Sequence, residues 1–351
     1  MKRLYIFDAL RCILALCVVI GHLGMFPLFG PVGQTNAFAN ELARGFRTLV
    51  FGPPAVVAFF LISGFCIHYP YCNIGNRRVS VGRFYVRRYI RILAPVFVIL
   101  MAFKIFIPTT LWIGKETILW HSTLWSIVCE EIYYGTYPFL NHLGRRYGWR
   151  VLICATIGSS LFTTYYFFPA KDWADIGVIA TTLTLLPVWL MGCHLAERVP
   201  SMVRDYSARE IWLRRFGAWS MMWAALMLHF HTEIYQTATA LWVGVGCYFW
   251  LRAEIFYYRN RSPWPVLRWS GRWSYSLYLV HPLVIAIWFK YNLGEMATRL
   301  GWTKGFLLVI AISYAFYLLI ERPSHNFARK IPMFAPEIAN TSLAQPATAG
   351  G

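Results

Sequence analysis

Three ionisable side chains occur within the first strongly apolar segment, residues 7–24, FDALRCILALCVVIGHLG. Such a group at the centre of a bilayer costs about 2.5–3.5 kcal/mol on insertion scales, so its presence there indicates a function by default. Arg11 and His22 are eleven residues apart, which in a helix is about three turns plus 20° and about 16 Å of rise. Both should therefore lie on one helix face, with Asp8 one turn before Arg11, where a carboxylate can hold a guanidinium.

A cation and an imidazole on one face could bind an anion and move a proton. Imidazole titrates near neutral pH, so His22 is a candidate general base that would take the proton of an attacking hydroxyl. The alternative is that Asp8 and Arg11 snorkel to the inner interface and His22 to the outer one.

A pair of adjacent carboxylates lies in a second apolar segment, residues 121–140, HSTLWSIVCEEIYYGTYPFL. Glu130 and Glu131 point about 100° apart in a helix, so only one can face a given partner. A carboxylate at that depth needs a cation or an imidazole to stay charged. We expect Glu130 to face such a partner and hypothesise that it orients His22 or stabilises its protonated form. A structural buried pair that fixes helix packing is the alternative.

A second histidine lies about eight residues into another apolar segment, residues 271–288. His281 precedes Pro282, which frees a backbone carbonyl and permits a kink. Tyr278 lies three residues before it. We assign His281, Tyr278 and Ser126 either to the acceptor side of a reaction or to structure, since a packing histidine would look the same.

Arginine fills all six basic positions of the stretch RRVSVGRFYVRRYIRILAP, residues 77–95. Arg88 and Arg91 are one turn apart at the predicted mouth of a span. Guanidinium offers a fork of donors that suits phosphate better than lysine does. The stretch therefore predicts a phosphate site, and an anionic lipid headgroup would satisfy the same fork.

The composition predicts that these residues sit in an all-α integral membrane protein. Of the 351 residues, 58% are hydrophobic and only 14% are charged. Apolar segments near the length needed to cross a bilayer recur along the chain and predict about ten transmembrane helices. They cover residues 6–24, 49–69, 92–113, 121–140, 151–168, 177–195, 216–231, 236–256, 273–293 and 303–320.

The basic residues indicate orientation. With the N-terminus inside, the inner segments carry 24 of the 33 Lys and Arg residues and the outer loops carry six. The positive-inside rule then predicts that both termini are cytoplasmic. Because topology accounts for the net charge of +18, we expect no nucleic-acid partner. Membrane lipids are expected partners.

Further features of the sequence indicate how the chain is divided into segments. The first apolar segment lacks a convincing cleavage site, so we expect it to remain in the mature protein. Residues 1–330 form the predicted membrane domain, and residues 331–351 a disordered cytoplasmic tail. The eight cysteines show no paired spacing and are expected to be buried free thiols. His229 and His231 lack further ligands at metal spacing, so we treat them as interfacial and predict no metal site.

The chain resembles the acyltransferase 3 family of bacterial membrane acyltransferases over most of its length. Six elements in order carry the resemblance: FDALR with Arg11 and His22, FFLISGF (59–65), RRYIRILAP with Arg88 and Arg91, LWSIVCEEIYYGTYP with Glu130 as its characteristic acid, GRWSYSLYLVHP and YLLIERP. Residues between about 141 and 260 contribute little to it.

The resemblance implies transfer of an acyl group, commonly acetyl, from cytoplasmic acyl-CoA to a hydroxyl of a glycan or lipid-linked glycan at the bacterial inner membrane. It implies no tightly bound cofactor, since acyl-CoA is a co-substrate. Some relatives carry an extracytoplasmic hydrolase-like domain, for which these 351 residues leave no room.

Combining residues and resemblance gives a mechanism in which Arg88, Arg91 and Arg11 hold the phosphates of coenzyme A. Ser63 is placed with the acyl-CoA site. His22 acts as base, while the oxyanion donor is left open among Arg11, Ser63, Ser126 and a tyrosine. A proton-coupled transporter or flippase would also use intramembrane Arg, Glu and His, and a structural subunit of a polysaccharide synthase is a third possibility. Protection from unfolding by acyl-CoA would separate these alternatives.

Overall fold

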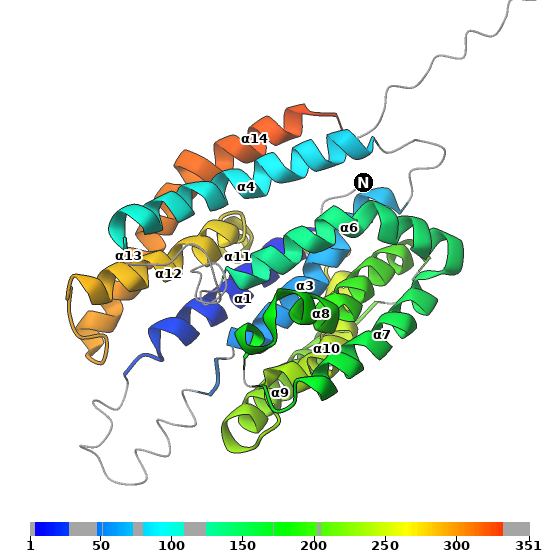
Figure 1. The fold of residues 1–351 in the computed structure, drawn as a ribbon, viewed down its shortest axis with the longest axis horizontal. Coiled ribbons are helices and arrows are strands. Elements are labelled where there is room, and N and C mark those ends of the chain that lie inside the picture. The colour runs from blue at the N-terminus through cyan, green and yellow to red at the C-terminus, as the bar shows by residue number, and fades with distance from the viewer. Residues whose placement is uncertain are drawn as a thin grey trace, which may run out of the picture.

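Helices form the described part of the chain, which contains no strand (Figure 1). The computed structural model describes residues 4–27, 48–50, 52–72, 80–108, 124–170, 172–201 and 205–332. Its ten long helices are α1 (Ile6–Leu23), α3 (Gly52–His68), α4 (Val81–Phe106), α6 (Trp125–Tyr147), α7 (Trp149–Tyr166), α8 (Trp173–Arg198), α9 (Ala208–His231), α10 (Gln236–Tyr257), α12 (Ser274–Lys290) and α13 (Arg299–Phe316). Shorter elements are α11 (Pro265–Ser270), α14 (Arg322–Lys330) and the π-turn η3 (Tyr317–Glu321).

Each predicted span falls on one of these long helices. Within the described residues, five stretches are long and apolar enough to cross a membrane: Ile6–Leu23, Gly52–Tyr71, Val81–Phe106, Asp175–Arg198 and Arg299–Lys330. The all-helical prediction is therefore confirmed for the described residues, while ten crossings and cytoplasmic termini stay predictions. The predicted tail lies outside the described residues from residue 333 onward.

Close helix packing places α3 at the centre of the structure, against α1, α8 and α10. The crossing with α8 needs glycine on both helices. A Cβ on Gly64 would lie 1.9 Å from the carbonyl oxygen of Trp189, and one on Gly192 would lie 2.1 Å from that of Leu61. Small residues that let backbones approach are the usual way to pack helices without a hydrophobic driving force. This contact fixes Ser63, the neighbour of Gly64.

A second group of helices packs beside α1. Helix α12 contacts α1, α4 and α13, and α14 lies along α4 (Figure 1). The short α11 contacts the first turns of α1 so closely that a Cβ on Gly271 would lie 1.8 Å from the carbonyl oxygen of Asp8. Helix α1 therefore has neighbours from both groups, and its polar face lies between them.

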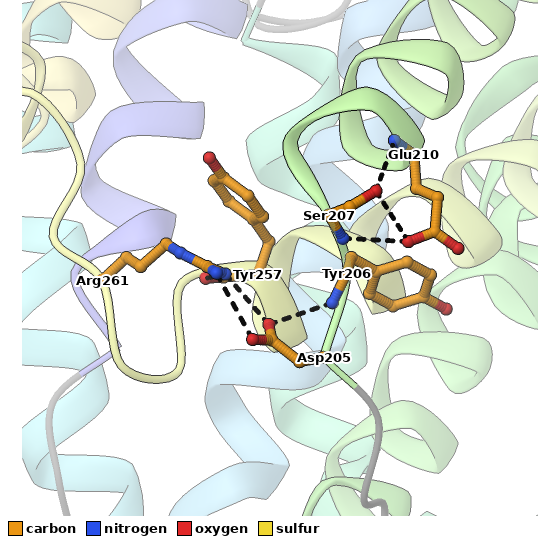
Figure 2. A network of polar contacts seen from close by, with 6 residues as sticks. All are labelled: Asp205, Tyr206, Ser207, Glu210, Tyr257 and Arg261. Carbon is orange, nitrogen blue, oxygen red and sulfur yellow. Dashed lines mark hydrogen bonds and ion pairs between the residues drawn. The ribbon is translucent and has the colours of Figure 1, made fainter.

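The chain between α8 and α9 is tied to the end of α10 by polar contacts (Figure 2). Ser207 and Glu210 form a capping box that starts α9. Arg261 pairs with Asp205 at 2.9 Å and also donates to the carbonyl oxygen of Tyr257. Both partners of the ion pair are exposed, so it adds little stability, about 0–1 kcal/mol, and mainly sets the position of this connection.

All eight cysteines are free thiols, as predicted. Five of them are buried, and Cys154 on α7 is exposed, unlike the expectation.

Candidate active site

Charged side chains from four elements meet among the helices. We call this group the charged layer and define it as Arg11 of α1, Arg88 and Arg91 of α4, Glu130 of α6 and Glu321 of η3. All except Glu321, which is buried, are half-buried. The sequence analysis had placed the first four in a functional site, and the structure brings them together.

The three guanidiniums of the charged layer lie within electrostatic reach of one another. Arg91 experiences the like charges of Arg88 and Arg11 together with the opposite charge of Glu321. Arg11 also interacts with Asp8, as its spacing predicted, and with Glu130. Clustered cations of this kind are stable only with anions around them, because their repulsion is weakly screened away from bulk water. The layer is therefore suited to hold a multiply charged anion.

The position of the arginines differs from the prediction of a helix mouth. The apolar segment that predicted this span begins at residue 92, but α4 begins at Val81. Arg88 and Arg91 thus lie about two to three turns inside the helix, and the guanidinium carbon of Arg88 lies 4.0 Å from the ring centroid of Tyr134. The apolar run marked the hydrophobic part of the helix and missed its polar first turns.

Glu130 is held by a hydroxyl pair. It accepts hydrogen bonds from Ser63 at 2.5 Å and from Tyr134 one turn further along α6. The indole of Trp189 in turn donates to the oxygen of Ser63 at 3.3 Å. Because the hydrogen of Ser63 goes to Glu130, this hydroxyl positions the carboxylate and is not available as an oxyanion donor. Sequence reasoning gave Tyr134 no role, although it follows Glu130 by four residues within the LWSIVCEEIYYGTYP element.

The two adjacent glutamates have different environments. Both carboxylate oxygens of Glu131 are buried without a hydrogen-bond partner in the described residues, while it interacts electrostatically with Glu130 and Arg88. The choice of Glu130 as the residue that faces partners agrees with this geometry.

Glu321 is a second residue to which sequence reasoning gave no role. It accepts from the backbone N–H of Ser276 at 3.1 Å and from its hydroxyl at 2.5 Å. The π-turn η3 carries it there, and such turns recur at functional sites. The signal was present in YLLIERP, which the sequence analysis used only as a motif.

A pair of histidines lies at the other end of α1. The ring nitrogens His22 Nδ1 and His281 Nε2 are 3.1 Å apart, and the two rings stack with centroids 5.2 Å apart. His281 is completely buried and His22 is exposed. We call these two residues the histidine pair. It lies about 16 Å along α1 from Arg11.

Tyr278 and Ser126 lie between the charged layer and the histidine pair. Their hydroxyl oxygens are 2.7 Å apart, which joins α12 to α6. The ring of Tyr278 meets that of His281 edge-on, with centroids 5.8 Å apart, and Tyr278 interacts electrostatically with Glu130. The structure therefore places Tyr278 against His281 and joins Ser126 to Tyr278, while the acceptor-side role of these residues stays a prediction.

The hypothesis that Glu130 orients His22 needs correction. The hydrogen-bond partners of Glu130 are Ser63 and Tyr134, at the depth of Arg11, and the partner of His22 is His281. The sequence could not choose between these partners, because a pairing across helices depends on how far each helix is shifted along its axis.

One group of potential metal ligands occurs in the described residues, although none was predicted. His68, Cys72 and Glu197 place their ligand atoms within 4.8 Å of one another. His68 Nε2 already donates to Glu197 at 2.7 Å, and its Nδ1 lies 2.9 Å from the hydroxyl of Tyr137. Both ring nitrogens are thus taken by protein partners.

A small cleft opens between α3, α8, α9 and α10, helices that carry neither member of the histidine pair. His229, expected to be interfacial, lines it beside Trp173 and Gln236.

Comparison with protein families identifies the family to which the chain belongs. The sequence profile of the acyltransferase 3 family, described as an acyltransferase domain, matches residues 4–318 of the 351-residue chain. Comparison with curated proteins found no match, and comparison with solved structures found none either. The profile spans α1 through α13 and ends at residue 318, within η3, so it includes every residue of the charged layer except Glu321, together with the histidine pair. The chain therefore belongs to the acyltransferase 3 family and is a multi-pass membrane acyltransferase.

Proposed function

We propose that this protein transfers an acyl group, preferably acetyl, from cytoplasmic acyl-CoA to a hydroxyl of an exported or cell-surface glycan. The proposal locates it in the bacterial inner membrane. Each substrate matches one kind of group at the site. The arginines suit the phosphates of coenzyme A, which carries the thioester, and the imidazole suits the proton of the alcohol acceptor.

In this proposal the charged layer holds the phosphates of coenzyme A. Arg88 and Arg91 bind them from α4, and Arg11 binds from α1. The carboxylates Glu130 and Glu321 keep the three guanidiniums charged and fixed in place. The narrow pantetheine arm then runs along α1 for about 16 Å, the rise between Arg11 and His22, and delivers the thioester to the histidine pair.

His22 acts as general base in the transfer. The acceptor hydroxyl gives its proton to the imidazole of His22 as its oxygen attacks the thioester carbonyl carbon. The C–S bond then breaks, and the thiolate of coenzyme A takes the proton back from His22. The products are an O-acyl glycan and free coenzyme A. Tyr278, which contacts the ring of His281, or its hydrogen-bond partner Ser126 donates a hydrogen bond to the oxyanion that forms in between.

The single observation that carries the proposal is the arrangement of α1. One face of one helix bears a guanidinium within a cluster of three and, about 16 Å away, an imidazole whose partner is a buried histidine. A transporter would not require a phosphate-binding cluster on the same helix face as an exposed imidazole.

The experiment measures transfer of label from radioactive acetyl-CoA to the glycan fraction of membrane vesicles that contain the protein. Label should enter the glycan only with this protein present. Stabilisation of the purified protein by coenzyme A against heat adds a binding readout. Failure of acyl-CoA both to donate label and to stabilise the protein would contradict the proposal and favour a transporter or a structural subunit.

The donor site has its own test. Arg91→Ala should raise the KM for acetyl-CoA at least about tenfold, because a charge-assisted contact to phosphate contributes about 1.5–3 kcal/mol. Arg87→Ala is the matched control, since Arg87 on the same helix donates to the carbonyl oxygen of Ile331 at 3.2 Å. Equal KM values for Arg91→Ala and wild type would contradict phosphate binding by this arginine.

A further inference from the structure

The hydrogen bonds of His281 determine which of its nitrogens carries the proton. Its Nδ1 lies 3.1 Å from the carbonyl oxygen of Leu277, one turn earlier in α12. A carbonyl oxygen can only accept, so Nδ1 must be the protonated nitrogen and must donate. In a neutral imidazole the other nitrogen is then a bare acceptor.

His281 is neutral in this arrangement. Its side chain is completely buried, and the polar and aromatic groups recorded around it in the described residues are the backbone carbonyls of Leu277 and Tyr278, the ring of His22 and the ring of Tyr278. No carboxylate is among them. A buried imidazolium without a counter-charge would be costly, so the neutral form is favoured.

The position of the proton on His281 determines which nitrogen of His22 carries a proton. Because His281 Nε2 is a bare acceptor 3.1 Å from His22 Nδ1, that Nδ1 must be protonated and must donate. The lone pair of neutral His22 is therefore on Nε2, the ring nitrogen turned away from this bond. His22 itself is exposed, unlike His281, and its ring also interacts with the backbone carbonyl of Val18, one turn earlier in α1.

We infer that His281 is a positioning residue that holds His22 in the tautomer with a free Nε2, the only tautomer in which that nitrogen can accept a proton. The chain of donors and acceptors runs from the Leu277 carbonyl through His281 to His22. The inference rests on the proposed function, because it gives a task to the base named there.

The same bond acts during transfer. When His22 takes the proton of the acceptor hydroxyl at Nε2, its Nδ1–H becomes a donor on a cation, and its hydrogen bond to His281 Nε2 strengthens. An uncharged acceptor stabilises the imidazolium less than a carboxylate would. We therefore expect loss of His281 to cost less than loss of the orienting acid of a serine protease triad, which is about 10⁴-fold.

Two amide variants distinguish a positioning role of His281 from a packing role. The amide group of Gln reaches the place of the imidazole Nε2, so His281→Gln can still accept from His22. The amide group of Asn reaches only the place of Nδ1, so His281→Asn can keep the bond to Leu277 but cannot reach His22. His281→Gln should keep most of kcat, whereas His281→Asn should lower kcat about 10- to 100-fold with an unchanged KM for acetyl-CoA.

A spectroscopic readout follows the tautomer directly. In protein labelled with ¹⁵N-histidine and held at a pH where imidazoles are neutral, the signals of His22 are identified by their loss in His22→Asn. Wild type and His281→Gln should show protonated Nδ1 and bare Nε2. His281→Asn should shift His22 toward the tautomer with protonated Nε2. His194→Gln, a histidine bonded to Tyr248 on another pair of helices, is the control and should leave the His22 signals unchanged.

Equal kcat for the Gln and Asn variants, or a His22 tautomer that is the same in both, would overturn the inference and leave His281 a packing residue. The activity measurement and the ¹⁵N measurement test different claims. Wild-type protein that transfers no acyl group would contradict the proposed function, while the ¹⁵N signals would still decide whether His281 sets the tautomer of His22.

Discussion

At the scale of single residues, partner geometry distinguishes groups that the sequence presents alike. Glu130 and Glu131 are adjacent carboxylates in the same span, yet Glu130 accepts from two hydroxyls and Glu131 has no hydrogen-bond partner in the described residues. The first is therefore a fixed countercharge of the charged layer. The second is a half-buried carboxylate whose oxygens lack hydrogen bonds, so the charge of Arg88 offsets only part of the cost of removing it from water.

This difference predicts opposite effects of the same substitution. Glu130→Gln should destabilise the protein by about 3 kcal/mol, because it leaves the guanidiniums of Arg11 and Arg88 without this counter-charge. Glu131→Gln, the matched control, should unfold at the same temperature as wild type or above it. Thermal unfolding in detergent measures both. If the two variants lost stability to the same extent, Glu130 would have no special place in the layer.

The residues that the sequence identified are those with an unusual chemical type for their surroundings. Arg11, His22, Glu130 and His281 stand out because ionisable groups are rare in apolar spans. Tyr134 and Glu321 have no such signal of their own, since a tyrosine is common in a span and Glu321 follows the last apolar run. Their roles depend on contacts across helices, which composition and spacing do not determine.

At the scale of helices, close approach of α3 and α8 positions the hydroxyl that holds Glu130. Gly192 faces the backbone of α3, where a Cβ would lie 2.1 Å from the carbonyl oxygen of Leu61 and 2.7 Å from the nitrogen of Phe65. A methyl group at Gly192 would force the two backbones apart and shift Ser63. The site thus depends on a contact that contains no catalytic residue.

Gly192→Ala should therefore lower stability by about 1–3 kcal/mol and reduce acyl transfer. Gly158→Ala on α7 is the control, since a Cβ there meets nothing within 4 Å. In a helix interior the control should be neutral or stabilise by about 0.5–1 kcal/mol. The measurement is the unfolding temperature together with activity per folded protein. A stable, active Gly192→Ala variant would show that the helices can separate without harm.

Helix positions were predictable from the sequence, and helix ends and neighbours were not. All ten apolar segments fall on long helices because apolar length is the dominant signal in a membrane protein. The start of α4 was misplaced by eleven residues from the apolar run at residue 92, since polar first turns of a helix resemble a loop. The pairing of His22 with His281 depends on the packing of α1 against α12. The hydrophobic periodicity of the sequence does not reveal which helices pack together.

At the scale of the whole molecule, orientation decides which substrate reaches which end of the site. With the N-terminus inside, the arginines face the cytoplasmic supply of acyl-CoA, and His22 lies toward the outer surface. The proposed mechanism requires this direction, because it takes its donor from inside the cell and passes the acyl group to an exported glycan.

The predicted orientation can be mapped with single cysteines in a background without native cysteines. Exposed positions Glu233 and Glu295 should react with a membrane-impermeant maleimide in intact spheroplasts when changed to Cys. Exposed positions Arg209 and Ser262 should react only after permeabilisation. This pattern follows from the excess of basic residues on the inner segments. The reverse pattern would place the arginines on the side without acyl-CoA.

The central claim is that His22 removes the proton of the acceptor hydroxyl. The most direct measurement is the single-turnover rate of acetyl transfer by purified wild type and His22→Gln in proteoliposomes, with coenzyme A binding checked by thermal stabilisation. Both proteins should bind coenzyme A equally, and the variant should transfer acetyl about 10² to 10⁴ times more slowly. A variant that binds coenzyme A and transfers acetyl at the wild-type rate would contradict the account.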